Sequence, residues 1–310
     1  MNATPHPAPS APTAGGGATT PAPFGARLRR AMDERGPLCV GIDPHPALLA
    51  AWGLPDDPGG LERFARTVVE ALAGRVAALK PQAAFFERFG ARGIAVLERA
   101  VAEARAAGAL VVMDAKRGDI GSTMTAYAEA FLRTGAPLFS DAVTLSPYLG
   151  FEALRPALDL ARANHCGVFV LARTSNPEGA EVQTATTAAG RPVADTILAR
   201  LAAENAGAQP LGSCGAVVGA TLAANGEGGT PGGGGDPGER FAINGPLLAP
   251  GLGAQGATAD DLPRVFGSAL PRVLPHVSRG VLRHGPDPAA LREAAAREAG
   301  RIARVAGSAG

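Results

Sequence analysis

The chain has 310 residues, of which 46% are hydrophobic, and this is enough for a large core in one large domain or two small ones. Its 29 basic and 28 acidic residues leave a formal net charge of +1, which excludes the strong overall field that draws proteins to nucleic acid or to anionic membranes. We therefore expect neither nucleic acid nor a membrane as a partner, and any anionic ligand must be bound by local groups.

The N-terminal residues 1–22 are dominated by Pro, Ala, Gly and Thr. We expect a disordered tail there, because such a segment buries too little apolar surface to offset the entropy of ordering. It has neither the basic start nor the apolar stretch of a secretory signal, and no later run reaches the ~18 apolar residues of a membrane span. A cytoplasmic protein is expected, with residues 23–306 forming a single domain.

Eight short apolar runs bounded by turn residues follow along the chain, and each is typical of a buried strand. Stretches with helical periodicity separate them; Leu61, Phe64, Val68 and Leu72, for example, share one helix face. Further helices are predicted around 94–101, 127–131, 151–158, 193–201 and 291–305. The predicted strands are 38–43, 76–80, 109–114, 141–145, 167–172, 215–220, 246–251 and 272–278.

Eight apolar strands that alternate with helices predict an α/β fold with a parallel sheet covered on its faces. Eight is also the number of strands that closes into a (β/α)8 TIM barrel, whose functional groups lie at the C-terminal ends of the strands. The alternative is an open doubly wound sheet. That fold more often carries G-x-G-x-x-G after its first strand, and "GIDPHP" at 41–46 lacks this motif.

One region departs from this alternation. Residues 225–240, "NGEGGTPGGGGDPGER", occupy the place of the helix after the sixth strand. Glycine disfavours helix, so we expect a flexible insertion with at most a short helical turn.

Charged residues gather at the end of the third strand, in "VVMDAKRGDIGST" at 111–123. Alternate side chains of a strand share a face, so Asp114 and Lys116 should point into the barrel mouth while Ala115 points outward. Asp119 lies beyond them, and Lys80 at the end of the second strand can approach Asp114 from the side. This pattern predicts an array of alternating charge, which is either a structural ion-pair network or a catalytic site.

The presence of lysine rather than arginine at these two positions favours a catalytic site over a structural ion-pair network. Lys80 and Lys116 are the only lysines among the 29 basic residues. A guanidinium stays protonated, whereas a desolvated ammonium can give up a proton. The two lysines therefore indicate a proton-transfer role, with chance retention as the alternative.

Metal chemistry has little support in the sequence. Cys39, Cys166 and Cys214 are far apart in apolar surroundings and are predicted to be reduced and buried. The five histidines show no metal-ligand spacing, so no metal site is expected.

A phosphate site is indicated after the last two strands. The glycine-rich "APGLGAQG" at 249–256 follows the seventh strand, and "SRG" at 278–280 ends the eighth. Loops at these positions commonly bind phosphate in this barrel, which makes Gln255 and Arg279 candidate ligands. Elsewhere, Ser146 contacts either a ligand or its own backbone, and Ser122 is typical of a helix N-cap.

These motifs resemble the orotidine 5'-phosphate decarboxylase family, and specifically its longer bacterial branch. They occur in the family's order, and the resemblance runs from about residue 25 to residue 305. The motifs that carry it are "GIDPHP", "LKPQAAFFERFG", "VVMDAKRGDIGST", "TLSPYLG", "LARTSNPEG", "VVGAT" and "PGLGAQG".

The resemblance implies a homodimeric barrel that converts orotidine 5'-monophosphate to UMP and carbon dioxide in pyrimidine biosynthesis, with no metal or organic cofactor. By this resemblance Lys116 donates a proton to C6 of the pyrimidine, Asp114 faces the substrate carboxylate, and Lys80 completes the charge network. The Gly-rich insertion departs from the family by replacing much of its sixth helix.

The resemblance also assigns binding roles. It implies that two incomplete sites are completed by dimerisation, because side chains of each subunit reach into the site of the other. The residues that would cross are Asp119, Ile120 and Thr123. Within one subunit, Asp43 would bind ribose hydroxyls, Ser146 the pyrimidine amide, and Gln255 and Arg279 the phosphate.

Two other functions fit part of the pattern. A sugar-phosphate lyase or aldolase of the same wider barrel group shares the D-x-K-x-x-D motif but uses magnesium. A non-catalytic nucleotide-binding barrel is the other alternative, although the intact Asp114, Lys116 and Asp119 argue against it.

Overall fold

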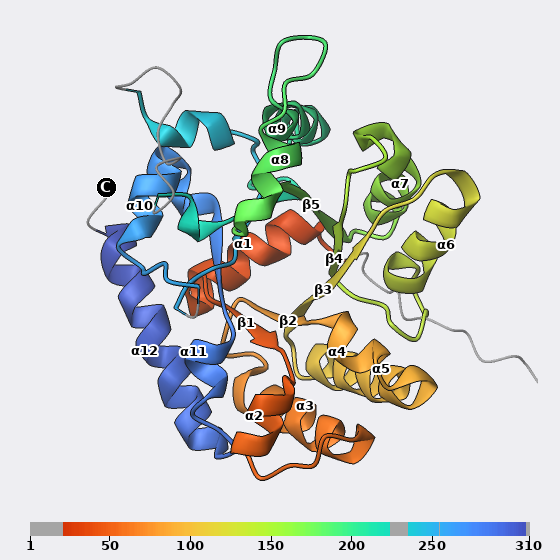
Figure 1. The fold of residues 1–310 in the computed structure, drawn as a ribbon, viewed down its shortest axis with the longest axis vertical. Coiled ribbons are helices and arrows are strands. Elements are labelled where there is room, and N and C mark those ends of the chain that lie inside the picture. Colours follow the sequence, from red (N-terminus) through yellow and green to blue (C-terminus); the bar gives the residue numbers. More distant parts are fainter. Residues whose placement is uncertain (1–20, 224–234, 254, 308–310) are drawn as a thin grey trace, which may run out of the picture.

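The computed structural model describes residues 21–223, 235–253 and 255–307. Residues 1–20 of the expected tail and 225–234 of the expected insertion lie outside the described residues. Eight parallel strands, each paired with the next and the last with the first, form a closed barrel, which confirms the predicted (β/α)8 fold (Figure 1). The strands are β1 (Cys39–Ile42), β2 (Ala78–Pro81), β3 (Leu110–Arg117), β4 (Ala142–Leu145), β5 (Gly167–Arg173), β6 (Cys214–Val218), β7 (Leu247–Ala249) and β8 (Val273–Val277).

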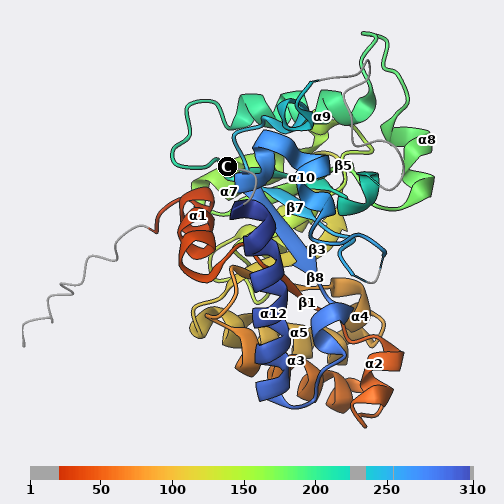
Figure 2. The same cartoon turned by 90° about the vertical axis from the view of Figure 1, so that its left-hand side faces the viewer.

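Helices surround the strands, and α12 packs beside α3 on the outside of the barrel (Figures 1 and 2). Short 3₁₀ segments complete several connections. No helix within the described ranges combines the length and apolarity needed to cross a bilayer. The helices are α1 (Phe24–Arg35), α2 (Pro46–Ala51), α3 (Pro58–Leu72), α4 (Ala83–Glu87), α5 (Gly90–Ala106), α6 (Gly121–Leu132), α7 (Arg155–Ala163), α8 (Ala180–Gln183), α9 (Val193–Glu204), α10 (Asp261–Phe266), α11 (Arg279–Leu282) and α12 (Pro288–Gly307).

Local sequence signals define several helix ends. At α3, the side chain of Asp57 accepts a hydrogen bond from the backbone N–H of Gly60 at 2.8 Å, and Pro58 occupies the first helical position. At α6 the sequence prediction was wrong. The helix begins at Gly121 with Ile120 as its N-cap residue and no side-chain cap, so Ser122 lies inside the first turn.

The core has two layers. The outer layer lies between the strands and the surrounding helices, and the inner layer fills the barrel together with residues of α1. Phe24 and Leu28 of α1 are fully buried, and the ring of Phe24 packs edge-on against Phe169 of β5 with centroids 6.0 Å apart. A Cβ at Gly167 would lie 2.1 Å from Phe24 Cδ1, so only glycine fits there. Helix α1 therefore closes the N-terminal end of the barrel.

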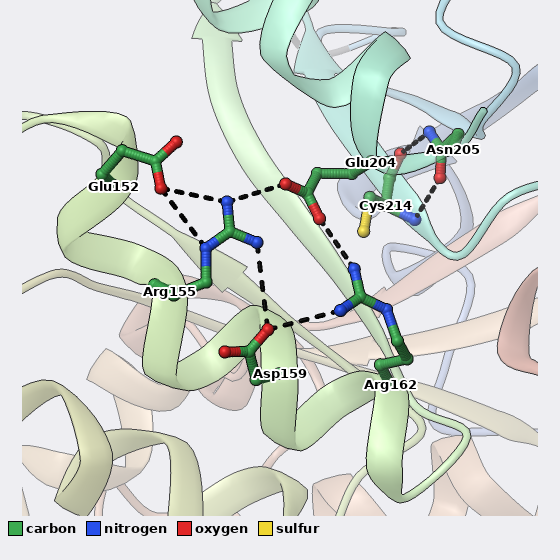
Figure 3. Close-up of polar contacts among 7 residues, drawn as sticks. All are labelled: Glu152, Arg155, Asp159, Arg162, Glu204, Asn205 and Cys214. Atoms are coloured by element: carbon green, nitrogen blue, oxygen red, sulfur yellow. Dashed lines mark hydrogen bonds and ion pairs between the residues drawn. The ribbon is translucent and has the colours of Figure 1, made fainter.

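An ion-pair network joins α7 to α9 on the outer surface (Figure 3). Glu204 of α9 accepts from Arg155 and from Arg162 of α7, each at 2.8 Å. Arg155 also donates to Glu152 at 3.1 Å. Exposed pairs of this kind contribute about 0–1 kcal/mol each, but Glu204 is only 12% exposed in its side chain and binds two guanidinium groups. The network therefore fixes the position of α7 relative to α9.

Two short 3₁₀ turns, Ala220–Ala223 and Pro237–Phe241, lie on either side of residues 224–234 in the sequence. Asp236 fixes the second turn, because its carboxylate accepts from the backbone N–H groups of Gly238 at 2.9 Å and Ser268 at 3.1 Å. Residues 237–240 of the insertion thus contribute a single short turn.

Candidate active site

A cavity of about 360 Å³ opens at the C-terminal ends of the strands. This is the end where a parallel α/β barrel places its functional loops. Six of the ten residues singled out from the sequence line it, namely Asp43, Lys80, Asp114, Lys116, Gln255 and Arg279.

Asp114 is the centre of the charged groups. Its Oδ2 accepts from Lys80 Nζ at 2.5 Å, and its Oδ1 accepts from Lys116 Nζ at 2.6 Å and from Thr144 Oγ1 at 2.9 Å. With its amide nitrogen turned toward the carboxylate, Gln82 donates to the same Oδ2 at 2.6 Å. The structure thus brings Lys80, Asp114 and Lys116 together as the alternating pattern predicted.

Burial and neighbouring charges shift the pKa values of Asp114 and Lys80 in opposite directions. Burial raises the pKa of Asp114, but Lys80 and Lys116 lower it by more, so the pKa lies well below the usual range and the carboxylate stays ionised. Burial lowers the pKa of Lys80, but Asp114 and Asp43 reverse the effect and raise it overall. Lys80 therefore stays protonated although it is only 4% exposed. Each charge is maintained by its neighbours in a site largely shielded from water.

Lys116 reaches the cavity by a route that differs from simple strand alternation. The register of β3 against β4 shifts between Met113 and Arg117, and Lys116 has φ +46°, in the left-handed region that non-glycine residues rarely adopt. Ala115 is buried in the outer core layer, as predicted. Lys116 combines this unusual backbone with a side chain that is 45% exposed, and such outliers often occur at functional positions.

Thr144 of β4 holds this backbone in place. Its Oγ1 accepts from the N–H groups of Ala115 at 3.1 Å and Lys116 at 2.9 Å while it donates to Asp114. One hydroxyl therefore connects the acidic group to the backbone that carries the second lysine. The sequence offered no signal for Thr144, because a threonine in an apolar strand is ordinary.

The wall next to Lys80 combines β1 and β8, since β1 pairs with β2 on one side and with β8 on the other. Asp43 and His276 are buried, and Ser278 is half-buried. Among the described residues, Asp43 Oδ1, His276 Nε2 and Ser278 Oγ have no hydrogen-bond partner. Burial lowers the pKa of His276 well below its ordinary value, and Lys80 lowers it further. Sequence reasoning did not single out His276, because an isolated histidine in a strand lacks a recognisable motif.

The predicted phosphate ligands lie on the rim. Gln255 and Arg279 are both exposed and both line the cavity. The loop that carries Gln255 turns at Gly251, which has φ +109°, and is closed by a hydrogen bond from Gly253 N to Ala257 O at 2.7 Å. Arg279 is the first residue of α11. A guanidinium and a side-chain amide are thus available to an anion at one edge of the cavity.

The remaining four predicted residues are not among the described residues that line this cavity. Asp119 accepts from Ile120 N at 2.8 Å, Ile120 is 62% exposed, and Thr123 is exposed on α6. Ser146 is half-buried after β4, where its N–H donates to Arg117 O at 2.8 Å. Asp119, Ile120 and Thr123 are therefore at least partly exposed and lie outside the described lining of their own chain's cavity.

Other sequence expectations concern metal and thiol chemistry. Cys39, Cys166 and Cys214 are free thiols, the first two buried and the third partly buried. Burial raises the pKa of Cys39 to about 12, which keeps this thiol protonated in the inner core layer. Within the described part of the chain, no three His, Cys, Asp or Glu side chains are grouped as a metal site requires.

Comparisons with known proteins agree with this geometry. The orotidine 5'-phosphate decarboxylase / HUMPS family model matches residues 36–294. An orotidine 5'-phosphate decarboxylase of Streptomyces coelicolor is 71% identical over 281 residues, which cover 90% of this chain and 97% of the relative. One of Salinispora arenicola is 64% identical over 88% of this chain and 95% of its own length.

Solved structures give the same result. A crystal structure from Streptomyces avermitilis assigned to this enzyme superimposes with a TM-score of 0.87 at 67% identity, covering 93% of this chain and 98% of the other. The Leishmania donovani OMP decarboxylase gives a TM-score of 0.70 at 30% identity, covering 91% of this chain and 98% of the other. The barrel, its charged mouth and these matches show that the chain belongs to the orotidine 5'-phosphate decarboxylase family.

Proposed function

We propose that this chain is a carboxy-lyase that converts orotidine 5'-monophosphate to UMP and carbon dioxide in pyrimidine biosynthesis, with Lys116 as the proton donor. The observation that carries the proposal is the position of Asp114 between two ammonium groups at 2.5 and 2.6 Å in the cavity. The identity to curated decarboxylases supports the reaction.

The reaction needs groups that stabilise developing negative charge, and it needs no oxidant. The bond between C6 and the carboxylate carbon breaks, carbon dioxide leaves, and the electron pair stays on C6. The ammonium of Lys116 stabilises this developing negative charge and transfers its proton to C6, after which solvent reprotonates the amine. Asp114 faces the substrate carboxylate, and this repulsion disappears as carbon dioxide departs, so the transition state is favoured over the ground state.

Binding of the nucleotide follows from the two sides of the cavity. Arg279 and Gln255 are suited to hold the phosphate at the rim, and Asp43 with Lys80 to bind the ribose hydroxyls. Ser146 contributes to recognition of the pyrimidine amide in this proposal. Contacts to the distant phosphate add transition-state stabilisation if they close the loop at Gly251 over the substrate.

The proposed active form is a homodimer with shared sites. Asp119, Ile120 and Thr123 are at least partly exposed and lie outside the described lining of their own chain's cavity, and each would complete the site of the partner subunit. Exposed apolar side chains in the loops after β3 and β4 support this arrangement: Ile120, Tyr148 and Leu149 are 62%, 77% and 54% exposed. Large exposed apolar side chains of this kind commonly mark a protein interface.

The direct test is the loss of absorbance from orotidine 5'-monophosphate in the presence of EDTA. We expect full turnover, and a requirement for added magnesium would favour the sugar-phosphate lyase alternative. Tight UMP binding without turnover would favour the non-catalytic barrel.

Lys116→Arg sharpens the test of the proton donor. The variant keeps the positive charge, but a guanidinium does not release its proton near neutral pH. We expect UMP binding without turnover. Turnover near that of the unmodified enzyme would show that charge alone is sufficient and would refute the assigned proton transfer.

A further inference from the structure

The wall formed by β1 and β8 holds polar groups that the proposed reaction steps do not use. His276 on β8 is 8% exposed and lines the cavity beside Asp43, which is 9% exposed. Within the described residues, neither Asp43 Oδ1 nor His276 Nε2 has a hydrogen-bond partner. Leaving such a group buried and unpaired costs about 1–3 kcal/mol, so two of them in one wall require an explanation.

The strand register brings the two groups to one place. His276 is paired with Cys39, which lies two residues before Gly41 and four before Asp43 on the neighbouring strand. A Cβ at Gly41 would lie 2.9 Å from Asp43 Oδ2 and 3.0 Å from His276 Nε2. Both polar atoms therefore border the same small space, which remains open because residue 41 has no side chain.

The chemistry of the two groups is complementary. An ionised carboxylate only accepts hydrogen bonds, whereas a neutral imidazole offers one N–H donor. Burial, Lys80 and Lys116 lower the pKa of His276, while Asp114 opposes them, and the net result keeps the ring neutral near pH 7. A neutral donor suits this position, because a third cation beside Lys80 would weaken the charge balance around Asp114.

We propose that His276 is a positioning residue whose Nε2–H binds the carboxylate of Asp43 and holds it toward the ribose hydroxyls of the nucleotide. The two groups are not bonded to each other in this structure, so the Asp43 carboxylate must rotate to accept this hydrogen bond, and no hydrogen bond from the described residues to Asp43 Oδ1 opposes the rotation. The inference rests on the proposed function through the ribose-binding role of Asp43. It assigns to β8 a part in sugar recognition, next to the proposed phosphate ligand Arg279 at the start of α11.

The test is a double-mutant cycle on UMP affinity with Asp43→Asn and His276→Leu. We expect His276→Leu to weaken UMP binding about tenfold, the scale of one lost charge-assisted hydrogen bond. In the Asp43→Asn background the same change should alter affinity less than about twofold, because the group that it positions is already impaired. An equal loss in both backgrounds would overturn the proposal.

Conservative variants separate positioning from packing. The amide N–H of His276→Gln lies near the position of Nε2, so this variant should recover most of the affinity, whereas His276→Asn should not. If Ser278→Ala rather than His276→Leu is coupled to Asp43, the serine is the positioning group and the proposal fails. His276→Asn replaces His276→Leu in the cycle if the leucine variant does not fold.

The unmodified enzyme provides the reference for both proposals. Absence of orotidine 5'-monophosphate turnover would overturn the proposed function and this inference together. Normal turnover with no coupling between Asp43 and His276 would overturn this inference alone.

Discussion

Thr144→Val removes one oxygen atom from the site and leaves the shape of the side chain almost unchanged. Thr144 is 1% exposed, and its hydroxyl makes three hydrogen bonds, to Asp114 Oδ1 and from the N–H groups of Ala115 and Lys116. Two N–H groups lose their acceptor, while Asp114 retains both ammonium groups. At about 1–3 kcal/mol for each of the two unsatisfied groups, we expect the free energy of unfolding to fall by about 2–6 kcal/mol.

The same substitution should impair catalysis, because Lys116 has φ +46° and Thr144 supplies the acceptor for its N–H. Without that acceptor the backbone can relax toward an ordinary conformation, and the ammonium moves away from Asp114. A displacement of about 1 Å at a reacting group costs about 10²-fold in rate. We therefore expect kcat to fall by this order while UMP still binds.

Urea unfolding at fixed protein concentration measures the stability effect. Trp52 is the only tryptophan in the sequence and is 6% exposed, so its fluorescence reports on unfolding. Thr144→Ser is the matched control, because it keeps the hydroxyl and loses a methyl group; it should retain turnover and lose about 1 kcal/mol. A valine variant within about 0.5 kcal/mol and twofold in kcat of the unmodified enzyme would refute the reasoning.

Three further predictions concern the charged site and its neighbours. Lys116→Ala should lower turnover by at least about 10³-fold while leaving a folded protein that binds UMP, and near-normal kcat would contradict its role. Mixing inactive Asp119→Ala and Lys116→Ala subunits should restore part of the activity, because one site of the hybrid dimer is intact; no recovery would argue against shared sites. Because the pKa of His276 is lowered in the folded chain, the unfolded chain takes up a proton on this histidine just below pH 6.5 while the folded chain does not. Protonation therefore favours the unfolded chain, and the stability that the neutral histidine maintains above pH 6.5 is lost as the pH falls. Relative to His276→Gln, the unmodified protein should lose about 1 kcal/mol between pH 6.5 and 5.5, and parallel stability curves would contradict this.

The barrel could be predicted because its strands are continuous apolar runs, and parallel strands buried on both faces have this composition. The same reasoning located Lys80, Asp114 and Lys116, since a charged residue at the C-terminal end of a buried apolar strand is expected to lie at the open end of the barrel. The third strand was predicted to end at 114 but continues to Arg117. Its last residues are charged, and hydrophobicity alone does not identify them as strand.

The missed features depend on pairing between strands. Thr144 is important because the register of β3 against β4 shifts beside it, and a single sequence contains no signal of a register shift. His276 faces Asp43 only because β8 pairs with β1 and closes the barrel. The left-handed backbone conformation of Lys116 could not be predicted from the sequence either, since lysine has no preference for that conformation.

The helix that closes the N-terminal end of the barrel has a practical consequence for handling the enzyme. Phe24 at the start of α1 packs against the first residue of β5, and the cavity opens at the other ends of the strands. A tag or surface linker attached ahead of Pro23 therefore joins the protein on the face away from substrate entry. Immobilisation through that end should leave nucleotide access open, whereas attachment through the β3–α6 connection would place the support against the mouth.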